Sequence, residues 1–286
     1  MAHSTGACMV ATGRKDEALA ARAVVTGAGS GIGRAFAREL GRRGGRVVCA
    51  DIDIDRARET VDMLRSEGAD GLPVQVDVGS LQQVEQMAEQ ADAFFSGAPT
   101  LVVNNAGVGA GGQPIGVTPI ADWQWVLNVN LWGVIHGSHV FMPRLRDQGF
   151  GGVINVCSTA SFAAAPRMGP YSTSKAAALA LTETLAAEAS GSGVSVTALC
   201  PTFVKTDIVR SGRIEAGAQA LAGRLMASWS VAPERVVRDA LRGLARGQLY
   251  VVPQLDARTI WRTKRWMPAL YTRGAGRLNR LLAARA

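Results

Sequence analysis

Short segments of apolar, β-branched residues alternate with longer helical patterns over most of the chain, and this alternation is the strongest constraint on its fold. Strands that are apolar on both faces are buried on both sides, and when helices separate them they form a parallel sheet. The sequence therefore predicts an α/β fold, a single doubly wound Rossmann-type domain with a seven-stranded parallel sheet flanked by helices. The seven segments are "RAVVTG", "RVVCAD", "LPVQVDV", "TLVVNNAG", "GGVINVCS", "VSVTALCP" and "QLYVVP".

The domain organisation follows from the ends of this alternation, because the 286 residues contain no internal repeat and no linker that marks a boundary. We expect residues 1–20 to be a flexible leader, residues 21–253 to form the Rossmann-type domain and residues 254–286 to form a basic amphipathic tail. Residues 202–230 interrupt the pattern after the sixth strand. Because insertions beyond the carboxyl ends of strands are where such folds bind ligands, we expect this segment to be a lid.

Charge and cysteine content limit the classes of partner. Of the net charge of +8, +7 lies in the tail, and a nearly neutral body argues against nucleic-acid binding. No apolar run reaches the roughly 18 to 20 residues of a membrane span, and "RKDE" interrupts the N-terminus before a secretory signal could form. Cys8, Cys49, Cys157 and Cys200 lack metal-ligand spacing, so we expect no metal and a cytoplasmic protein with reduced thiols.

The stretch "TGAGSGIG" follows the first predicted strand and opens a helix. Its glycines Gly27, Gly31 and Gly33 permit a tight turn and let backbone N–H groups approach phosphate, whose charge is favoured at a helix N-terminus. A glycine pattern alone is weak evidence in a chain with 33 glycines, but the flanking strand and helix make this one specific. We expect a dinucleotide to bind at this loop, which also includes Ser30 and Ile32.

Asp51 ends the second predicted strand, on the order of 20 residues after the glycines. A carboxylate there accepts both adenosine ribose hydroxyls and repels a 2′-phosphate. No basic residue stands there or at the neighbouring Ile52, so the sequence predicts NAD rather than NADP, although a carboxylate in a surface turn is the simpler alternative. At the end of the third strand, Asp77 and Val78 should contact the adenine ring. At the end of the fourth, Asn104, Ala106 and Gly107 should line the rest of the cofactor site.

The stretch "YSTSK" puts Tyr171 and Lys175 four residues apart, on one face of a predicted helix. Such a pair in isolation is usually an interfacial tyrosine beside a solvated lysine. Beside a bound dinucleotide, however, the ammonium favours the phenolate, which suits the tyrosine to acid/base chemistry near neutral pH. Ser158, at the end of the fifth strand, is placed to donate to a substrate oxygen. Asn130 on the preceding helix is placed to hold a water that relays protons to Lys175.

In order and spacing, "TGAGSGIG", "NNAG", the Asn of "NVN", Ser158 and "YSTSK" closely resemble the short-chain dehydrogenase/reductase family, in its NAD-using branch. The resemblance covers roughly residues 21–253. It implies a catalytic tetrad of Asn130, Ser158, Tyr171 and Lys175, in which Tyr171 is the acid/base, Ser158 polarises the substrate oxygen and Lys175 also binds the nicotinamide ribose. It also implies a homodimer or homotetramer, and cofactor contacts from Pro201, Val204 and Thr206.

One position departs from the family pattern. After the sixth strand the family usually has Pro-Gly, whereas this chain has Thr202 in place of the glycine. The resemblance therefore does not predict the path of the lid near Phe203.

The segments around the tetrad are apolar and carry few charges, which favours a hydrophobic secondary alcohol or ketone, alicyclic or steroid-like, as substrate. The predicted activity is NAD-dependent interconversion of such an alcohol and its ketone. Alternatives are an NADP-dependent carbonyl reductase and a non-catalytic dinucleotide-sensing protein, although a sensor has no need of the serine and tyrosine. The residues expected to contact the substrate are Ser158, Phe162, Met168, Tyr171, Phe203 and Trp229.

Several other polar and aromatic residues are predicted to have structural roles. We expect His136 and His139 to be packed or interfacial, and Trp123, Trp125 and Trp132 to fasten their helix to the sheet. In the tail, Pro268 and the glycines of "GAG" at 274–276 should produce short helices. We favour a tail that packs, with its tryptophans buried, over the substrate mouth or a neighbouring subunit; weak peripheral contact with an anionic membrane is the alternative.

Overall fold

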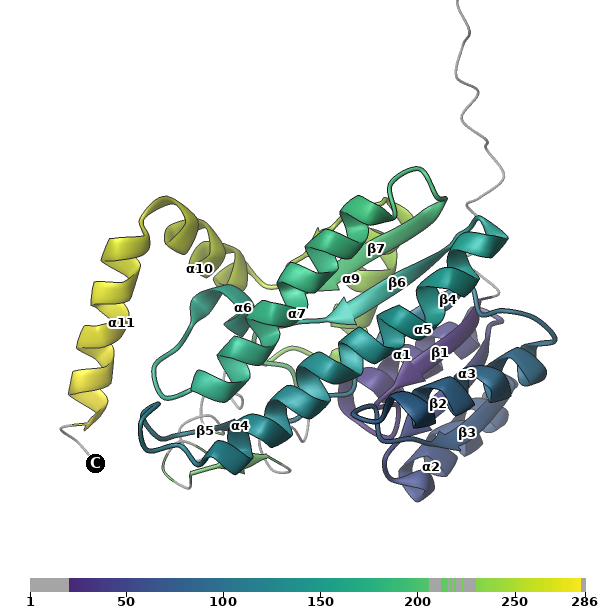
Figure 1. Ribbon diagram of the computed structural model, residues 1–286, viewed down its shortest axis with the longest axis horizontal. Helices are drawn as coiled ribbons and strands as arrows, with labels where there is room; N and C mark the ends of the chain where they lie inside the picture. Colours follow the sequence, from purple (N-terminus) through teal and green to yellow (C-terminus); the bar gives the residue numbers. More distant parts are fainter. Residues whose placement is uncertain are drawn as a thin grey trace, which may run out of the picture.

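The computed structural model describes residues 21–205, 212–215, 217, 219, 223 and 230–283, and it confirms the predicted fold class. Seven parallel strands form one sheet in the order β3-β2-β1-β4-β6-β7-β9, with helices on both sides (Figure 1). The strand order reverses beside β1, which makes the sheet doubly wound. The strands are β1 (Arg22–Thr26), β2 (Arg46–Asp51), β3 (Gly71–Gln75), β4 (Leu101–Asn104), β6 (Gly151–Val156), β7 (Val194–Leu199) and β9 (Tyr250–Val251).

The two faces of the sheet are covered by different helices. Alternate residues of one strand point to opposite faces, so Val25 of β1 contacts the layer of α1, α2 and α9, whereas its neighbour Val24 contacts the layer of α3, α5 and α7. Both valines are fully buried, which explains why the strands are apolar throughout rather than alternating. These helices are α1 (Gly31–Arg42), α2 (Ile54–Ser66), α3 (Leu81–Phe95), α5 (Gly133–Gln148), α7 (Gly169–Glu188) and α9 (Pro233–Ala245).

Two predicted elements differ from the structure. The segment 120–149, expected as one helix, comprises α4 (Ile120–Leu127), a π-helical turn η2 (Asn128–Trp132) and α5. The third strand ends at Gln75, so the predicted adenine contacts Asp77 and Val78 lie in the loop after it. There the Asp77 carboxylate accepts a hydrogen bond from the backbone N–H of Gly79, which stabilises the turn into α3.

The expectation that all three tryptophans fasten their helix to the sheet is wrong for Trp132. Its side chain is half exposed on the outer surface, where its ring lies 5.6 Å from that of His136. His136 itself is packed, as expected: its Nδ1 lies 2.8 Å from the backbone oxygen of Val78. Trp125 packs against a charged group, because the guanidinium of Arg213 lies 4.3 Å from its ring centroid.

Two smaller features stand over the carboxyl end of the sheet. The short strands β5 (Ala110–Gly111) and β8 (Arg213–Ile214) pair in parallel, and the short helix α6 (Ala160–Ala163) precedes α7. The tail forms α10 (Leu255–Trp266) and α11 (Pro268–Ala283), which stand at the edge of the molecule beyond α6 (Figure 1). Pro268 separates the two helices as predicted, but the glycines at 274–276 do not interrupt α11, so that part of the prediction is wrong.

A chain of buried amides ties the centre of the sheet to α7. Asn104 of β4 donates to the Asn155 side chain of β6 at 2.9 Å, and Asn155 donates to the hydroxyl of Thr182 on α7 at 3.0 Å. All three side chains are buried, and Asn155 and Thr182 are inaccessible to solvent. Buried groups that pair in this way favour one register between strands and helix, because a slip would break their hydrogen bonds, although the side-chain oxygen of Asn104 has no partner among the described residues.

Asn155→Ala should therefore lower the free energy of unfolding by about 1–3 kcal/mol, since it leaves buried polar groups of Asn104 and Thr182 without their partner. Urea unfolding followed by circular dichroism measures the change. Gln124→Ala, an exposed substitution on α4, serves as the control and should shift stability by no more than about 0.5 kcal/mol. Equal effects of the two substitutions would contradict a structural role for the amide chain.

Candidate active site

The glycine-rich loop between β1 and α1 has the backbone that only glycine adopts readily. Gly27 and Gly31 have φ of +63° and +51°. A Cβ on Gly33 would collide with the backbone of Gly27, so the loop closes onto the start of α1 only because this residue lacks a side chain. Ser30 precedes the helix and makes no side-chain capping bond, which leaves the first N–H groups of α1 available to a phosphate.

A second loop, after β4, holds the glycine-rich loop in place. The side-chain amide of Asn105 donates to the backbone oxygens of Thr26 and Gly27, at 2.8 and 3.2 Å. The buried hydroxyl of Thr26 in turn accepts from the backbone N–H groups of Asn105 and Ala106, at 3.0 and 3.1 Å. These contacts explain "NNAG" better than the prediction did, because Asn105 was not singled out.

The side chain of Asn104, which was predicted to line the groove, points into the sheet instead. It is 2% exposed and bonded to Asn155, so only its backbone is left for a cofactor. Neighbours on a strand point to opposite faces, so the choice between the two asparagines depended on where β4 ends.

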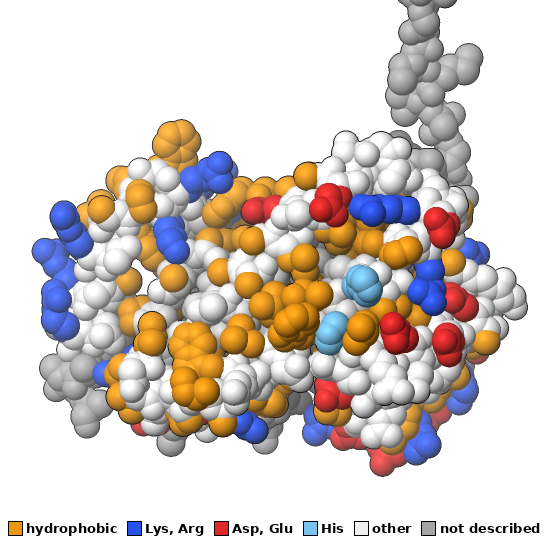
Figure 2. Space-filling view, viewed as in Figure 1, with side chains coloured by type: hydrophobic (Ala, Val, Ile, Leu, Met, Phe, Trp, Pro, Cys, Tyr) orange, Lys and Arg blue, Asp and Glu red, His pale blue; other side chains and the backbone are white. Residues whose placement is uncertain are grey.

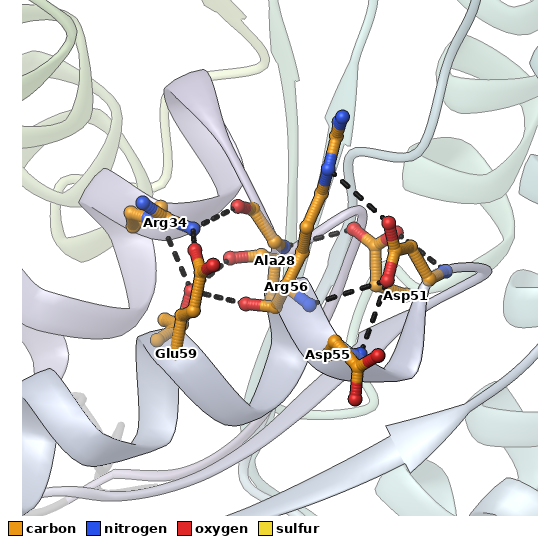
Figure 3. Close-up of polar contacts among 9 residues, drawn as sticks. Ala28, Arg34, Asp51, Asp55, Arg56 and Glu59 are labelled. Carbon is orange, nitrogen blue, oxygen red and sulfur yellow. Dashed lines mark hydrogen bonds and ion pairs between the residues drawn. The ribbon is translucent and has the colours of Figure 1, made fainter.

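Asp51 at the end of β2 faces the glycine-rich loop (Figure 3). Its carboxylate accepts from the backbone N–H of Gly29 at 2.8 Å and from that of Asp53 at 3.1 Å. The neighbouring Ile52 is 66% exposed, so it lies at the open side of the site. Asp51 thus stands where a ribose beside the loop would meet its carboxylate.

Two arginines near Asp51 were missed by the sequence analysis. Arg34 of α1 donates to the backbone oxygen of Gly29, to the hydroxyl of Thr60 at 3.0 Å and to Glu59 at 2.9 Å (Figure 3). Arg56 of α2 pairs with Asp53 at 3.3 Å, and its Cβ packs beside Gly29. Both guanidiniums are therefore bound to carboxylates, which reduces their attraction for a 2′-phosphate. Arg34 could have been found from the sequence, because it is a basic residue one turn inside the helix that follows the glycines.

Tyr171, Lys175 and Ser158 gather where α7 passes the carboxyl end of β6. Tyr171 is half-buried and lies beside Ser158, which is itself 8% exposed and lowers the pKa of the phenol. Lys175 is 3% exposed and donates from Nζ to the backbone oxygen of Val156 at 2.8 Å. Gly107 lies beside it, and a Cβ there would be 3.3 Å from Nζ. A lysine ammonium can donate three hydrogen bonds, so Lys175 has further N–H groups available to a ligand.

Without a bound cofactor, the surroundings of this pair do not favour the phenolate. Burial raises the pKa of the Tyr171 phenol, and the hydrogen bond with Ser158 opposes that rise. Burial also lowers the pKa of Lys175. Desolvation disfavours both charged forms, so the side chains alone do not bring the phenol toward neutral pH. The expected activation of Tyr171 by Lys175 thus needs a further positive charge in the site.

Asn130 lies within the π-helical turn η2 and is fully buried. Its side chain accepts from the N–H of Val108 at 2.7 Å and donates to the oxygen of Val108 at 2.9 Å and to the hydroxyl of Ser174 at 3.1 Å. With these bonds the amide locks the loop after β4 to α7, and it has no N–H left to hold a water. The relay water predicted at Asn130 would therefore have to donate to an oxygen of this residue, on the side chain or the backbone.

The predicted substrate contacts lie in different parts of the structure, as follows from their burial and neighbours. Phe162 of α6 and Met168 before α7 are half-buried, as is Phe203. The ring of Phe162 lies 6.2 Å from that of Trp261 in α10, so the tail packs beside one of the predicted substrate contacts. Among the predicted cofactor contacts, Pro201 and Val204 are buried and Ile32 packs partly against the core. Thr206 and Trp229 lie outside the described residues.

Thr202, the departure from the family pattern, anchors the tail. Its N–H donates to the side chain of Gln254 at 3.1 Å and its hydroxyl donates to Asp256 at 3.1 Å. Gln254 also donates to the backbone oxygen of Phe203 at 3.2 Å. A glycine could not make the hydroxyl contact. The threonine therefore fixes the start of α10 to the segment that follows β7.

Two further classes of site have no counterpart in the described parts of the chain. No group of three or more His, Cys, Asp or Glu side chains there is arranged to hold a metal ion. Among the same residues, no helix has the length and apolar character needed to cross a bilayer.

The fold and this edge of the sheet define a Rossmann-type protein in which a glycine-rich loop opens the first helix and a Ser-Tyr-Lys cluster lies at the carboxyl end of β6. Comparison with known proteins agrees: the family model described as short chain dehydrogenase matches residues 21–216. The chain belongs to the short-chain dehydrogenase family.

Three similar proteins illustrate the range of this relationship. Probable oxidoreductase EphD of Mycobacterium tuberculosis is 40% identical over 186 residues, 65% of this chain, but the chain spans only 31% of the length of that relative. The 1-deoxy-11-beta-hydroxypentalenate dehydrogenase of Streptomyces exfoliatus is 34% identical over 82% of this chain and 84% of the relative. A short-chain dehydrogenase/reductase from Burkholderia phymatum, solved in complex with NAD, has a TM-score of 0.84 and 34% identity over 89% of this chain and 96% of its own.

The raised pKa of Tyr171 predicts a measurable titration. In protein without added cofactor, the absorbance difference at 295 nm between wild type and Tyr171→Phe should have its midpoint above pH 10. Because the folded state holds this proton more tightly than the unfolded state, the phenol contributes stability below pH 10 that is lost as pH rises through its folded pKa. A midpoint below about pH 9 would show that the protein alone activates the phenol.

Proposed function

We propose that this protein is an NAD-dependent oxidoreductase that interconverts a hydrophobic secondary alcohol and its ketone, with Tyr171 as acid/base. The observation that carries the proposal is that Tyr171 lies beside Ser158, close enough for this hydroxyl to lower the pKa of the phenol, and one helical turn from a buried lysine next to Gly107. A phenol and a hydroxyl that lie this close can both be directed at a single substrate oxygen.

The residues of the groove fit a dinucleotide. The loop of Gly27, Gly31 and Gly33 leaves no room for side chains, and the start of α1 offers N–H groups to a pyrophosphate. The carboxylate of Asp51 would accept the adenosine ribose hydroxyls in place of the N–H of Gly29, and it favours NAD over NADP. Lys175 would donate its remaining N–H groups to the nicotinamide ribose. The complex of the Burkholderia phymatum protein with NAD supports this choice.

In the oxidative direction, NAD+ supplies the acceptor for the hydride that leaves the carbinol carbon. Tyr171, as phenolate, takes the hydroxyl proton, while Ser158 donates to the same oxygen and holds it in place. Lys175 and the positive charge of the oxidised cofactor together stabilise the phenolate, which the protein alone disfavours. Asn130 acts by position, because it fixes the loop after β4 against α7. In reduction, Tyr171 returns the proton.

The substrate class follows from the wall of the site. Phe162, Met168 and Phe203 are apolar, and Trp261 of α10 extends the wall beside Phe162. Apolar walls with a few polar groups suit an alicyclic or steroid-like alcohol. The likeness to a dehydrogenase of a hydroxypentalenate supports an alicyclic substrate. We further propose that residues 202–230 act as the lid, with Trp229 as a substrate contact and Thr206 as a cofactor contact.

The remaining expectations are also proposals. The domain of residues 21–253 would bind the cofactor and carry out catalysis, with residues 1–20 as a leader and residues 254–286 as a tail. We propose a homodimer or homotetramer, to which the exposed Trp132 on the outer surface of η2 would contribute. The free, buried thiols of Cys49, Cys157 and Cys200 support a reducing, cytoplasmic location.

A panel of hydrophobic secondary alcohols, assayed with NAD+ and with NADP+ by absorbance at 340 nm, tests the proposal. We expect NADH formation with at least one alicyclic alcohol and a large preference for NAD+. A large preference for NADP+ would favour the carbonyl reductase. Tight binding of NADH, with no turnover of any alcohol or ketone, would favour the non-catalytic sensor.

Tyr171→Phe should reduce kcat by about 100-fold or more while the Kd for NADH changes little, because only the exchangeable proton is lost. Lys175→Ala should reduce kcat and also weaken NADH binding by roughly tenfold, since a charged hydrogen-bond donor is removed. NADH fluorescence titration and steady-state rates separate the two effects. Tyr250→Phe removes a phenol that is bonded to Glu183 and should leave both constants unchanged. Wild-type turnover in Tyr171→Phe would refute the mechanism.

Asp51→Ala combined with Ile52→Arg should shift the ratio of kcat/KM for NAD+ to that for NADP+ by about 100-fold or more toward NADP+. The double variant removes the ribose acceptor and introduces a positive charge at an exposed position. Asp55→Ala is the control: it removes an exposed carboxylate in the first turn of α2 and should leave the ratio unchanged. An unchanged ratio in the double variant would exclude Asp51 as the selector.

A further inference from the structure

The tail carries a surface that the proposed dehydrogenase chemistry does not use. From residue 258 to the end of the chain there are eight basic residues and no acidic one. In the described part of the tail, Arg262, Arg265, Arg273, Arg277 and Arg280 are exposed, and none of them forms an ion pair with a described carboxylate. This positive charge is therefore not neutralised within the described structure.

The arginines of α11 share one side of the helix. Arg273, Arg277 and Arg280 are spaced by four and three residues, which places them on a single helical face. Figure 2 shows Lys and Arg side chains along the outer edge of the molecule, where α11 lies in Figure 1. A row of cations on an outward face suits a flat, negatively charged surface.

Large apolar side chains lie next to these arginines, at the corner where α10 meets α11. Trp266 is 81% exposed, Leu270 is 60% exposed and Met267 is 48% exposed. Trp266 is therefore not buried within this chain, whereas Trp261 packs against Phe162 and Tyr250; burial of Trp266 against a neighbouring subunit stays a prediction. Exposing three such residues side by side has a cost that a partner would remove.

The inward side of the tail is fixed to the body. Ala257 is fully buried, Asp256 accepts from Thr202, and Asn279 of α11 accepts from Arg167 at 3.1 Å. The backbone of Arg167 has φ of +62°, an unusual value for a side chain of this size, and its half-buried guanidinium reaches across to the tail. The fold thus holds α10 and α11 in one orientation and leaves the corner outward.

We propose that the corner of α10 and α11 binds the surface of an anionic membrane. Trp266, Met267 and Leu270 would enter the headgroup region while Arg265 and Arg273 stay among the lipid phosphates. A second copy of the chain fits this face less well, because a symmetric contact would oppose arginine rows of the same charge. Nucleic acid would use the arginines but would leave the apolar corner in water.

Sedimentation of the full-length protein with large unilamellar vesicles tests the proposal. We expect binding to vesicles of 70% phosphatidylcholine and 30% phosphatidylglycerol, weak binding to pure phosphatidylcholine, and a loss of binding in roughly 0.5 M salt. The triple variant Arg273→Gln/Arg277→Gln/Arg280→Gln should bind about 100-fold more weakly, at roughly fivefold per arginine. Trp266→Ser should bind roughly tenfold more weakly. Thermal unfolding confirms that each variant folds.

The matched control is Arg235→Gln/Arg238→Gln/Arg246→Gln, which removes the same charge from exposed arginines at α9 that form no ion pair with described residues. It should bind vesicles as wild type does. Equal binding to neutral vesicles, equal losses in the two triple variants, or no vesicle binding at all would overturn the proposal. A change of native mass in Trp266→Ser would also overturn it, because that result would assign the corner to a second copy of the chain. So would a 20-base-pair DNA that displaces the vesicles and binds Trp266→Ser with the wild-type affinity, because that result would assign the arginines to nucleic acid.

Discussion

The buried ammonium of Lys175 is the interaction on which the active-site geometry depends. Taking a charge out of water is unfavourable unless it gains hydrogen bonds, and in this protein the backbone oxygen of Val156, at the end of β6, supplies one at 2.8 Å. That bond ties α7 to the end of the sheet, which places Tyr171 one turn earlier beside Ser158. Gly107 completes the arrangement, because any larger residue would crowd Nζ. Loss of the bond between Lys175 and Val156 would allow Tyr171 to move away from Ser158.

Around this centre, side-chain amides connect loops that the sheet alone would leave independent. Asn130 joins the loop after β4 to α7, and Asn105 joins the same loop to the glycine-rich turn. Neither amide has to touch a substrate for its loss to matter, because each determines where a backbone segment lies. On the other side of the turn, Arg34 and Thr60 bind the oxygens of Gly29 and Ala28. The glycine-rich loop is thus held by its neighbours in the structure without a cofactor.

Much of this arrangement could be predicted because it depends on local patterns. Seven apolar segments between helices predicted the sheet, "TGAGSGIG" predicted the turn between β1 and α1, and "YSTSK" predicted the helix face that carries Tyr171 and Lys175. The failures concern direction and distance. The choice of Asn104 over Asn105 depended on a single residue at a strand end, and the pKa of Tyr171 depends on burial, which the sequence does not display. The role of Thr202 needed Gln254 and Asp256, about fifty residues away in the chain. The exposure of Trp266 likewise depends on how α10 docks.

The central claim is that Tyr171 moves a proton on the same oxygen whose carbon exchanges a hydride with the cofactor. The most direct measurement uses alicyclic secondary alcohols that carry deuterium on the carbinol carbon, incubated with NAD+ and the full-length protein. NMR of the reduced cofactor should find one deuterium at C4 of the nicotinamide for each ketone formed, with no exchange into solvent. Tight NADH binding without any such transfer across the panel, in protein that is folded and of native mass, would contradict the account.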